Sequence, residues 1–381
     1  MKKLLSLCCA AILAFPVSAQ PTADEVMQVT RLANDYFMSK YSDPTVPTNV
    51  KRVRPSSLWT RAVYYEGLMA LYDIDPQQRY LDYTDKWASF HKWTPRNGIT
   101  TNDADDQCCE QTYLMRFEKV GDSTMIRPTI ANLQHQMKTP NTKKPEAEGA
   151  LCGWWTWIDA IQMAMPVYMH MYKLTGDVRY RDHGMNMYVW SRDTLAGGLL
   201  NKKSGLWWRD KDYVPPYKEP DGQDCYWSRG NGWVYAALVR CMNQLPAKDK
   251  VYKRLKKDFL LMTKGVVATQ REDGFWNPSL ASTNYAMPET SGTALFLYGL
   301  CWGMNQGYLK VKDYKPIADR AWQAMVKTAV HRDGFLGWMQ GTGKDPSAGQ
   351  PLSYDKVPDF EDYGTGCFLL GATEYYKLLN K

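Results

Sequence analysis

Apolar and aromatic stretches of helical length alternate with short turns along most of the chain. Each stretch ends at a turn that contains Gly, Asp or Pro, and a second helical stretch then begins, usually close to a Tyr. Five such pairs can be read: Gly67–Tyr72 before Tyr80, Phe117 before Gly121, Val167–Tyr172 before Tyr180, Leu238–Met242 before Tyr252, and Leu297–Met304 before Tyr314. Because the pairs recur at intervals of roughly 45 to 75 residues, they predict a degenerate repeat of helical hairpins, without the strict period of a solenoid.

Five or six helical hairpins joined by long loops predict an all-α fold, an (α/α)6 barrel in which an outer ring of helices surrounds an inner ring. Loops 201–224, 273–289 and 333–362 are long enough to carry function at one end of this barrel. The chain has no alternating pattern of strands and helices, which argues against a TIM barrel or a Rossmann fold. No linker or change of composition divides it, so we expect residues 20–381 to form a single domain.

The amino terminus has the pattern of a secretory signal peptide. Met1-Lys-Lys3 is followed by an apolar run from Leu4 to Val17 and by the small residues of Val17-Ser-Ala19, which predicts cleavage before Gln20. The run is shorter than the roughly 20 apolar residues that span a bilayer, and no later segment is long enough, so membrane insertion is not expected. The sequence predicts an exported protein, located in the periplasm.

Charge and aromatic content narrow the class of ligand. The formal net charge is +7, from 47 Lys and Arg against 40 Asp and Glu, and no basic run or nucleic-acid motif accompanies it. The 15 Trp and 25 Tyr are typical of a carbohydrate cleft, because sugar rings stack on aromatic faces, although large aromatic side chains also fill cores. These features point away from nucleic acid and favour a sugar, including an anionic one.

The cysteines and histidines give no support for a metal site or a disulfide framework. Seven cysteines remain after the predicted cleavage, none in CxxC spacing, and most are expected to be small buried residues. The chain has only five histidines, namely His91, His135, His170, His183 and His331, and they form no metal-ligand pattern.

Asp159 is the first candidate for catalysis. It lies in Leu151–Pro166, where apolar residues occupy every face of the expected helix, so its carboxyl group should be buried. Burial raises the pKa of an acid, and such an acid can hold a proton near neutral pH and deliver it to a substrate. A structural alternative is that Asp159 caps the helix or pairs with a buried arginine.

Two further segments carry candidate binding residues. The acidic loop Asn102–Gln107 leads into an apolar helix, and of Asp105 and Asp106 one is expected to cap that helix while the other contacts water or sugar hydroxyls. In Trp227–Trp233, glycines allow close approach of the backbone, indoles offer stacking faces, and Arg229 offers a fork that matches a carboxylate. The alternative for this second segment is a tight turn at a helix start.

Taken in order along the chain, these segments resemble the unsaturated rhamnogalacturonyl hydrolases of glycoside hydrolase family 105, which are close to family 88. The resemblance runs from about Trp59 to the carboxyl terminus. Its motifs are Asn102–Gln107 with Gln111–Tyr113, Trp157–Asp159 with Met163, Gly205–Asp210, Trp227–Trp233, Thr293–Phe296, Gly341–Gly343 and Asp359–Gly366. The fold of this family is the (α/α)6 barrel, which agrees with the helical pattern.

The resemblance implies an exo-acting enzyme that removes a 4,5-unsaturated uronic acid from the non-reducing end of lyase-generated oligosaccharides. By motif match, Asp159 protonates C4 of the double bond and then helps water to add at C5. Asp105 or Asp106 is implied as the second acid. The remaining residues that the resemblance implies for the subsite of the unsaturated sugar are Trp157, Met163, Trp227, Arg229 and Trp233, with Arg229 near the uronate. The mechanism needs no cofactor or metal.

One departure from the family pattern concerns the substrate. Some relatives carry a histidine where this chain has Trp207-Trp-Arg209-Asp, so Arg209 is expected to shift selectivity among acidic or branched substrates. Three alternatives remain: an unsaturated glucuronyl hydrolase for another acidic polysaccharide, a sugar epimerase with paired histidines, and a non-catalytic carbohydrate-binding toroid. The sequence leaves open which sugar follows the uronate and whether the protein is a monomer or a dimer.

Overall fold

The computed structural model describes residues 20–49, 53–138 and 153–381. The predicted signal peptide, residues 1–19, and Cys152 lie outside these ranges. Twelve α-helices are formed there: α1 (Ala23–Lys40), α2 (Trp59–Tyr72), α3 (Gln78–Phe90), α4 (Ala104–Val120), α5 (Arg127–Lys138), α6 (Asp159–Thr175), α7 (Val178–Asp193), α8 (Ser228–Met242), α9 (Lys250–Ala268), α10 (Thr290–Asn305), α11 (Val311–Thr328) and α12 (Asp362–Leu379). The strands β1 (Thr48–Asn49) and β2 (Val53–Arg54) form a short antiparallel pair, and η1 (Ser123–Met125) and η3 (Leu195–Gly197) are single 3₁₀ turns.

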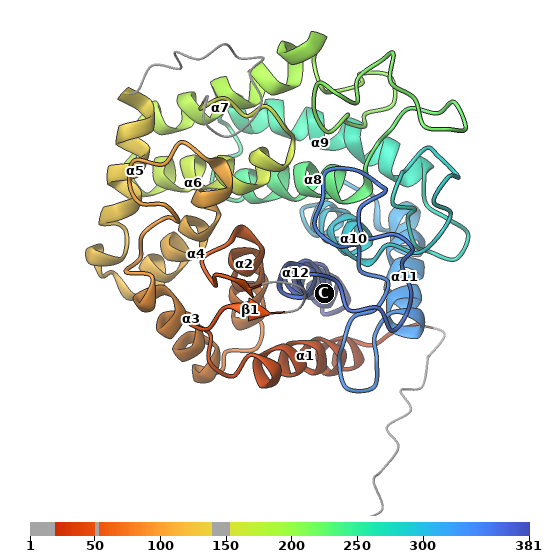
Figure 1. Ribbon diagram of the computed structural model, residues 1–381, viewed down its shortest axis with the longest axis horizontal. Coiled ribbons are helices and arrows are strands. Elements are labelled where there is room, and N and C mark those ends of the chain that lie inside the picture. The colour runs from red at the N-terminus through yellow and green to blue at the C-terminus, as the bar shows by residue number, and fades with distance from the viewer. Residues whose placement is uncertain (1–19, 50–52, 139–152) are drawn as a thin grey trace, which may run out of the picture.

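The even-numbered helices close a ring in which each contacts the next, in the order α2, α4, α6, α8, α10, α12 and back to α2. The odd-numbered helices lie around this ring at the periphery (Figure 1). Helix α11, for example, packs on α10, and α1 packs on α12 although the two come from opposite ends of the chain. This arrangement is the predicted (α/α)6 barrel, and the α12–α1 hairpin is the sixth pair.

Burial follows from the position of each helix in the two rings. In α10 every residue from Thr290 to Met304 is buried, as expected for a helix that has protein on all sides. In α11 the buried residues recur at helical spacing, Ala318, Ala321, Trp322 and Met325 among them, so this helix presents one apolar stripe to the ring and a polar face to solvent.

Glycines allow α2 and α12 to approach closely where the ring closes. A Cβ atom on Gly67 would lie 2.5 Å from the carbonyl oxygen of Gly366, and one on Gly366 would likewise clash with the backbone of Val63. These two positions therefore require glycine because backbone meets backbone there.

The six inner helices begin at the same end of the barrel, here called the N-terminal face. The indole of Trp59 at the start of α2 lies 5.6 Å from the ring of Tyr363 at the start of α12. Arg229 at the start of α8 donates to the carbonyl of Gln340, in the loop before α12, and Thr290 at the start of α10 donates to the same loop at Trp338. The loops that precede the inner helices therefore gather at this face.

Candidate active site

Asp159 is the first residue of α6 and lies at the N-terminal face with only 8% of its surface exposed. Burial raises the pKa of its carboxyl group, and the nearby Arg209 guanidinium opposes that rise. The Nε atom of Arg209 lies 3.3 Å from Oδ2 of Asp159. The structure therefore combines both interpretations from the sequence: Asp159 is a buried acid with a raised pKa, and it pairs with an arginine.

The loop before α8 fixes the positions of Arg209 and Asp159 relative to each other. The backbone N–H of Ile158 donates to the carbonyl of Arg209 at 2.9 Å, and Trp157 forms an isolated β-bridge with Asp210. Nη1 of Arg209 also donates to Oδ2 of Asp210 at 2.6 Å. Arg209 thus bridges two carboxylates, while 19% of its side chain stays exposed toward solvent or a ligand.

Asp105, at the second position of α4, belongs to the same group of acids. Its pKa is raised well above the usual value, first by burial and then by the negative charges of Asp103 and Asp159, while Arg209 opposes the rise. Asp103 caps α4 through the N–H of Asp105, and burial raises its pKa to about 6. The three carboxyl groups therefore hold protons more tightly than free acids do, and the charges of Asp103 and Asp159 both act on Asp105.

Asp106 has a different environment. Its Oδ2 accepts hydrogen bonds from Thr101 Oγ1 at 2.5 Å and from Asn97 Nδ2 at 3.0 Å, and Arg96 lies 3.6 Å from Oδ1. Only 1% of the residue is exposed. The structure thus places Asp105 beside Asp159, whereas Asp106 fastens loop 97–101 to α4, and the capping role falls to Asp103, which the sequence analysis did not single out.

Arg229 is fully buried, and both of its terminal nitrogens are engaged, whereas its Nε has no hydrogen-bond partner among the described residues. Nη1 donates to the carbonyl of Gln340 at 3.1 Å and Nη2 to that of Gly341 at 2.8 Å, while the guanidinium lies 4.5 Å from the indole of Trp227 and 5.0 Å from the ring of Tyr363. In this arrangement Arg229 fastens loop 329–361 to α8. These contacts give Arg229 a structural role that the sequence did not predict. Its expected contact with a uronate stays a prediction.

The other expected subsite residues line or support the same region. Trp157 is partly exposed next to Asp159, whereas Met163, Trp227 and Trp233 are each at most 1% exposed. Nε1 of Trp227 donates to Oε1 of Gln340, and Trp233 packs edge-on against Trp59 at 6.1 Å. Of this group, Trp157 is the side chain with surface open to a sugar, and the buried residues pack beneath the face.

Glu66 is a buried acid that the sequence analysis missed. It lies in α2 with no exposed surface, accepts from Gln162 Nε2 at 2.8 Å and from Cys108 Sγ at 3.3 Å, and pairs with Arg240. Gln162 follows Asp159 by three residues and Cys108 follows Asp105 by three, so Glu66 joins α4 and α6 about one turn beneath the two acids. Its position in the apolar stretch Tyr65-Glu66-Gly67 is the same signal that identified Asp159.

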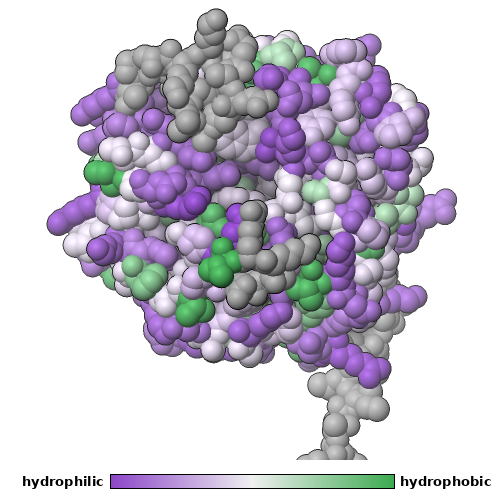
Figure 2. Space-filling model, viewed as in Figure 1, coloured by the Kyte–Doolittle hydropathy of each residue, from purple (hydrophilic) through white to green (hydrophobic). Residues whose placement is uncertain are grey.

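The inner helices also leave backbone donors at the N-terminal face. The cap residues of α2, α6, α8 and α12 make no side-chain capping hydrogen bond, whereas Asp103 caps α4 and Glu289 caps α10. First-turn N–H groups without a cap carry partial positive charge and attract anions. Figure 2 shows the molecule in the view of Figure 1, with hydrophilic residues over most of the surface and small hydrophobic patches near its centre.

The described ranges contain no group of three or more His, Cys, Asp or Glu side chains arranged for a metal ion. No helix there has the length and apolar character that a bilayer crossing requires. The six cysteines of these ranges are buried free thiols. His170 pairs with Glu118 near the carboxyl ends of α6 and α4, far along both helices from Asp159 and Asp105.

Comparison with known proteins gives a family match over most of the chain. The family described as Glycosyl Hydrolase Family 88 matches residues 29–379. Two curated relatives are named Unsaturated 3S-rhamnoglycuronyl hydrolase. The one from Alteromonas sp. (strain LOR) is 34% identical over 71% of this chain and 66% of its own length, and the one from Formosa agariphila is 30% identical over 84% of each.

A solved structure described as a glycosyl hydrolase family 88 protein from Bacteroides vulgatus has the same fold. It superposes with a TM-score of 0.82 at 31% identity and covers 94% of this chain and 100% of its own. Together with the family match, this similarity confirms the resemblance drawn from the motifs and the barrel fold predicted from the helical pattern.

Proposed function

This chain belongs to glycosyl hydrolase family 88, and from that membership we propose that it removes a 4,5-unsaturated uronic acid from the non-reducing end of oligosaccharides already cut by a polysaccharide lyase. One observation carries the proposal: Asp159 and Asp105, two acids with raised pKa, lie together at the N-terminal face beside the partly exposed Arg209. A retained proton and an adjacent cation are what hydration of an anionic enol ether requires.

Asp159 in its protonated form is the proton donor. Its proton goes to C4 of the double bond, and positive charge develops at C5, where the ring oxygen stabilises it. The resulting carboxylate then takes a proton from water as the water oxygen bonds to C5. The product is a hemiketal, whose ring opens to a ketone at C5 and an open hemiacetal at C1 that releases the next sugar as an alcohol. One water is consumed in all.

Asp105 assists by position and charge. The negative charge of Asp159 contributes to the raised pKa of Asp105, so the protonation of the two acids is linked. Asp105 in either state can hydrogen-bond the attacking water or a hydroxyl of the sugar. The Arg209 guanidinium stabilises the Asp159 carboxylate that forms after proton transfer, which limits the cost of creating a buried charge.

The N-terminal face favours a ligand with a carboxylate. The positive ends of six helices point to it, four of them without a side-chain cap, and the Arg209 guanidinium is partly exposed there although it pairs with Asp159 and Asp210. Trp157 supplies an aromatic surface beside the acids.

The substrate class follows from two sources. The motifs suggested rhamnogalacturonan, and the two curated relatives are named for rhamnoglycuronyl substrates. Both contain rhamnose, so the proposed substrate is an unsaturated uronate attached to rhamnose. The amino-terminal pattern supports a periplasmic location, where such oligosaccharides would arrive after lyase cleavage.

The test is the loss of ultraviolet absorbance of the conjugated uronate. Purified protein is mixed in parallel with lyase-generated oligosaccharides from rhamnogalacturonan, ulvan and hyaluronan. Decay with a rhamnose-containing substrate is expected. Decay with hyaluronan alone would assign the chain to the glucuronyl hydrolases of glycosaminoglycans, and a stable absorbance with all three would reject the proposed reaction.

A further inference from the structure

A groove lies between two outer helices, α7 and α9, on the outside of the barrel. Helix α7 packs on α6 and α9 packs on α8, and both lie at the periphery (Figure 1). The groove has a volume of about 720 Å³, within the range of roughly 300–1,000 Å³ that is usual for ligand sites. Its lining includes Trp154, Met185, Asn186, Trp190, Lys250 and Arg254.

Ion pairs between the two helices fix the walls of this groove. Nη1 of Arg181 on α7 lies 3.0 Å from Oδ2 of Asp249, which caps α9. Further along α7, Nη2 of Arg192 lies 2.8 Å from Oδ1 of buried Asp258, and the hydroxyl of Tyr188 donates to the same carboxylate at 2.9 Å. The walls are thus held by the fold, so a ligand would meet a preformed site.

Helix α7 presents an apolar and aromatic face to the groove although it is an outer helix. Met185, Val189 and Trp190 recur there at helical spacing, and Trp190 is partly exposed. The ring of Trp154 lies 4.8 Å from that of Trp190, with an angle of 38° between the ring planes. Asn186 is exposed on the same face and supplies an amide that can donate and accept hydrogen bonds. Aromatic rings beside a polar group suit the CH faces and hydroxyls of a sugar.

The wall formed by α9 is basic. This helix contains six Lys and Arg residues against one acid, Asp258, which pairs with Arg192. Lys250, Lys257 and Lys264 are exposed and recur every seven residues, so they form one stripe along about 21 Å of the helix. Because Lys250 also lines the groove, the positive stripe begins inside it.

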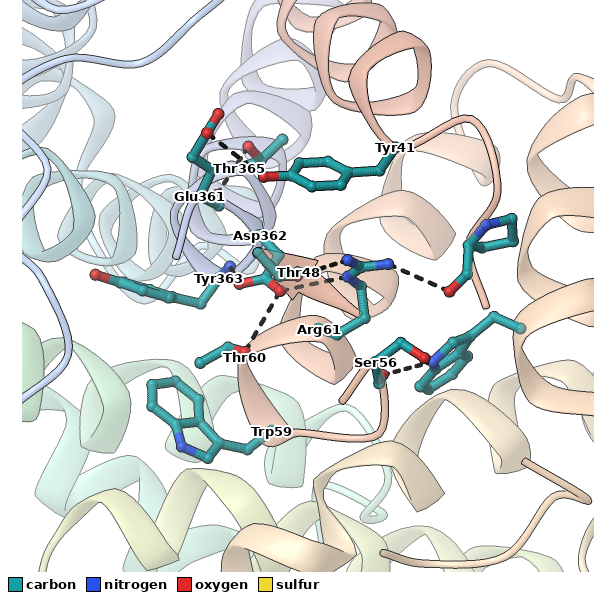
Figure 3. A network of polar contacts seen from close by, with 12 residues as sticks. Tyr41, Thr48, Ser56, Trp59, Thr60, Arg61, Glu361, Asp362, Tyr363 and Thr365 are labelled. Atoms are coloured by element: carbon teal, nitrogen blue, oxygen red, sulfur yellow. Dashed lines mark hydrogen bonds and ion pairs between the residues drawn. The ribbon is translucent and has the colours of Figure 1, made fainter. Parts of the chain in front are cut away.

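The lysines of this stripe differ from the basic residues that hold the fold together. Figure 3 shows one of the latter: Nε of buried Arg61 lies 3.3 Å from Oδ2 of Asp362. By contrast, among the described residues no carboxylate pairs with Lys250, Lys257 or Lys264, although other basic residues of this region have such partners. Their charges are therefore available to an anionic ligand.

We propose that this groove is a second carbohydrate site, which binds a saturated stretch of an acidic oligosaccharide outside the active site. Sugar rings stack on Trp190 and Trp154, and the carboxylates of uronic acids lie along the lysines of α9. The concave shape favours a sugar chain over a membrane, because a flat lipid surface would reach the lysines and leave the indoles uncontacted. The inference goes beyond the proposed function, since a saturated chain has no double bond to hydrate and the groove takes no part in the chemistry.

The test uses a rhamnogalacturonan hexasaccharide cut by a hydrolase instead of a lyase, so that it contains no double bond. Calorimetry at low salt measures its binding to wild type, Trp190→Ala and the double variant Lys250→Gln/Lys257→Gln. Trp190→Ala should weaken binding by about tenfold or more, as the loss of an aromatic anchor implies. The double variant should weaken it by about threefold and reduce its salt dependence. Both variants should keep the wild-type kcat/KM for an unsaturated disaccharide, which is too short to need the groove.

Lys312→Gln is the matched control, because Lys312 is exposed on α11, which packs on α10. It should bind the hexasaccharide as wild type does. A carboxyl-reduced hexasaccharide should bind wild type more weakly and should not distinguish the double lysine variant from it. Thermal unfolding checks the fold of each protein, and if Trp190→Ala is unfolded, Trp190→Leu and the lysine variant decide.

Unchanged binding in both groove variants would overturn the inference, as would a parallel loss of disaccharide turnover in folded protein. Vesicles of phosphatidylglycerol are titrated alongside, and binding to the vesicles without binding to the hexasaccharide would assign the basic face to lipid and reject the sugar site. If wild type consumes no unsaturated disaccharide, the proposed function fails, and the calorimetric comparison of folded variants still decides the groove.

Discussion

The two ends of the inner ring use the same kinds of residue in opposite ways. At the carboxyl ends of the helices, a polar pocket of about 190 Å³ contains Asp73, Glu118 and Glu374, and each of these acids has a basic partner. At the N-terminal face, Asp103, Asp105 and Asp159 are close enough to interact electrostatically, with Arg209 as the nearby cation.

The pKa values record this difference. His170 and Lys173 lower the pKa of Glu118 to about 2, whereas burial and neighbouring acids raise those of Asp105 and Asp159. Burial lowers the pKa of His170, and its pair with Glu118 opposes that shift. A raised pKa alone does not distinguish the two roles, because buried Glu66 and Asp106 also have raised pKa values and hold the structure together. What sets Asp105 and Asp159 apart is that they lie near each other and near the partly exposed Arg209, which is why the proposed chemistry is placed at this end of the helices.

Asp159→Asn should have the largest effect. Removing the proton donor is expected to lower kcat by about 10²- to 10⁴-fold, the usual contribution of general acid catalysis. The raised pKa of Asp159 means that its carboxyl group costs stability as pH rises through that pKa, so the melting temperature at neutral pH should be equal or higher. Absorbance decay and thermal unfolding check both points, and a variant with a near-normal rate would remove Asp159 from the mechanism.

Asp105→Asn and Asp106→Asn compare two neighbouring acids in the first turn of α4, one proposed to take part in turnover and one that holds a loop. Asp105→Asn should lower kcat by about 10²-fold with little change in stability. Asp106→Asn should lower the free energy of unfolding by about 1–2 kcal/mol, because one amide oxygen cannot replace both carboxylate oxygens that face Thr101, Asn97 and Arg96. Burial raises the pKa of Asp106, so removal of the charge offsets part of this loss at neutral pH. Turnover and chemical denaturation of the two proteins are compared. The reverse outcome would exchange the roles given to these acids.

Arg209→Gln tests the cation beside the proton donor. Arg209 lowers the pKa of Asp159, so its removal should raise that pKa and move the loss of activity at high pH to a higher pH. A fall in kcat/KM of about tenfold should accompany the shift, because the developing carboxylate loses a charge-assisted contact. The measurement is the pH dependence of absorbance decay, and a shift to lower pH would contradict the geometry.

Glu118→Gln should have the smallest effect and should spare turnover. The pKa of Glu118 is depressed, so its pairs stabilise the fold above the unfolded pKa of about 4.3, and that contribution is lost as pH falls toward the folded value. Because the carboxylate is partly exposed, screening limits the loss at neutral pH to about 1 kcal/mol. Urea unfolding at pH 7 and at acidic pH measures this change in stability. A drop in kcat would mean that the two ends of the inner ring are energetically coupled.

Much of the fold was predictable because the helical hairpins are local in sequence. The five pairs read from turns and apolar runs correspond to α2–α3, α4–α5, α6–α7, α8–α9 and α10–α11. The sixth pair joins α12 to α1 from the two ends of the chain. No local pattern can reveal that pair, since the contact depends on closure of the ring.

The sequence could predict which acidic and aromatic residues form the site, whereas the partners of each residue depend on three-dimensional contacts. Asp159 could be identified because a carboxyl group in an apolar helix is costly to bury unless it is paired or protonated, and the same argument applies to Glu66. The difference between Asp105 and Asp106 depends on which side of α4 meets loop 97–101. Arg229 donates to the carbonyls of Gln340 and Gly341, which follow it by 111 and 112 residues in the sequence, so no local pattern could predict these contacts.

The most direct test of the account follows two events in one reaction: loss of the conjugated absorbance and release of the next sugar. Rapid mixing of wild type with an unsaturated disaccharide, sampled for both signals, gives their order. If Asp159 protonates C4 before the sugar linkage opens, absorbance loss precedes or coincides with release. Release of the sugar while the double bond is still intact would show attack at the anomeric carbon and would contradict the mechanism.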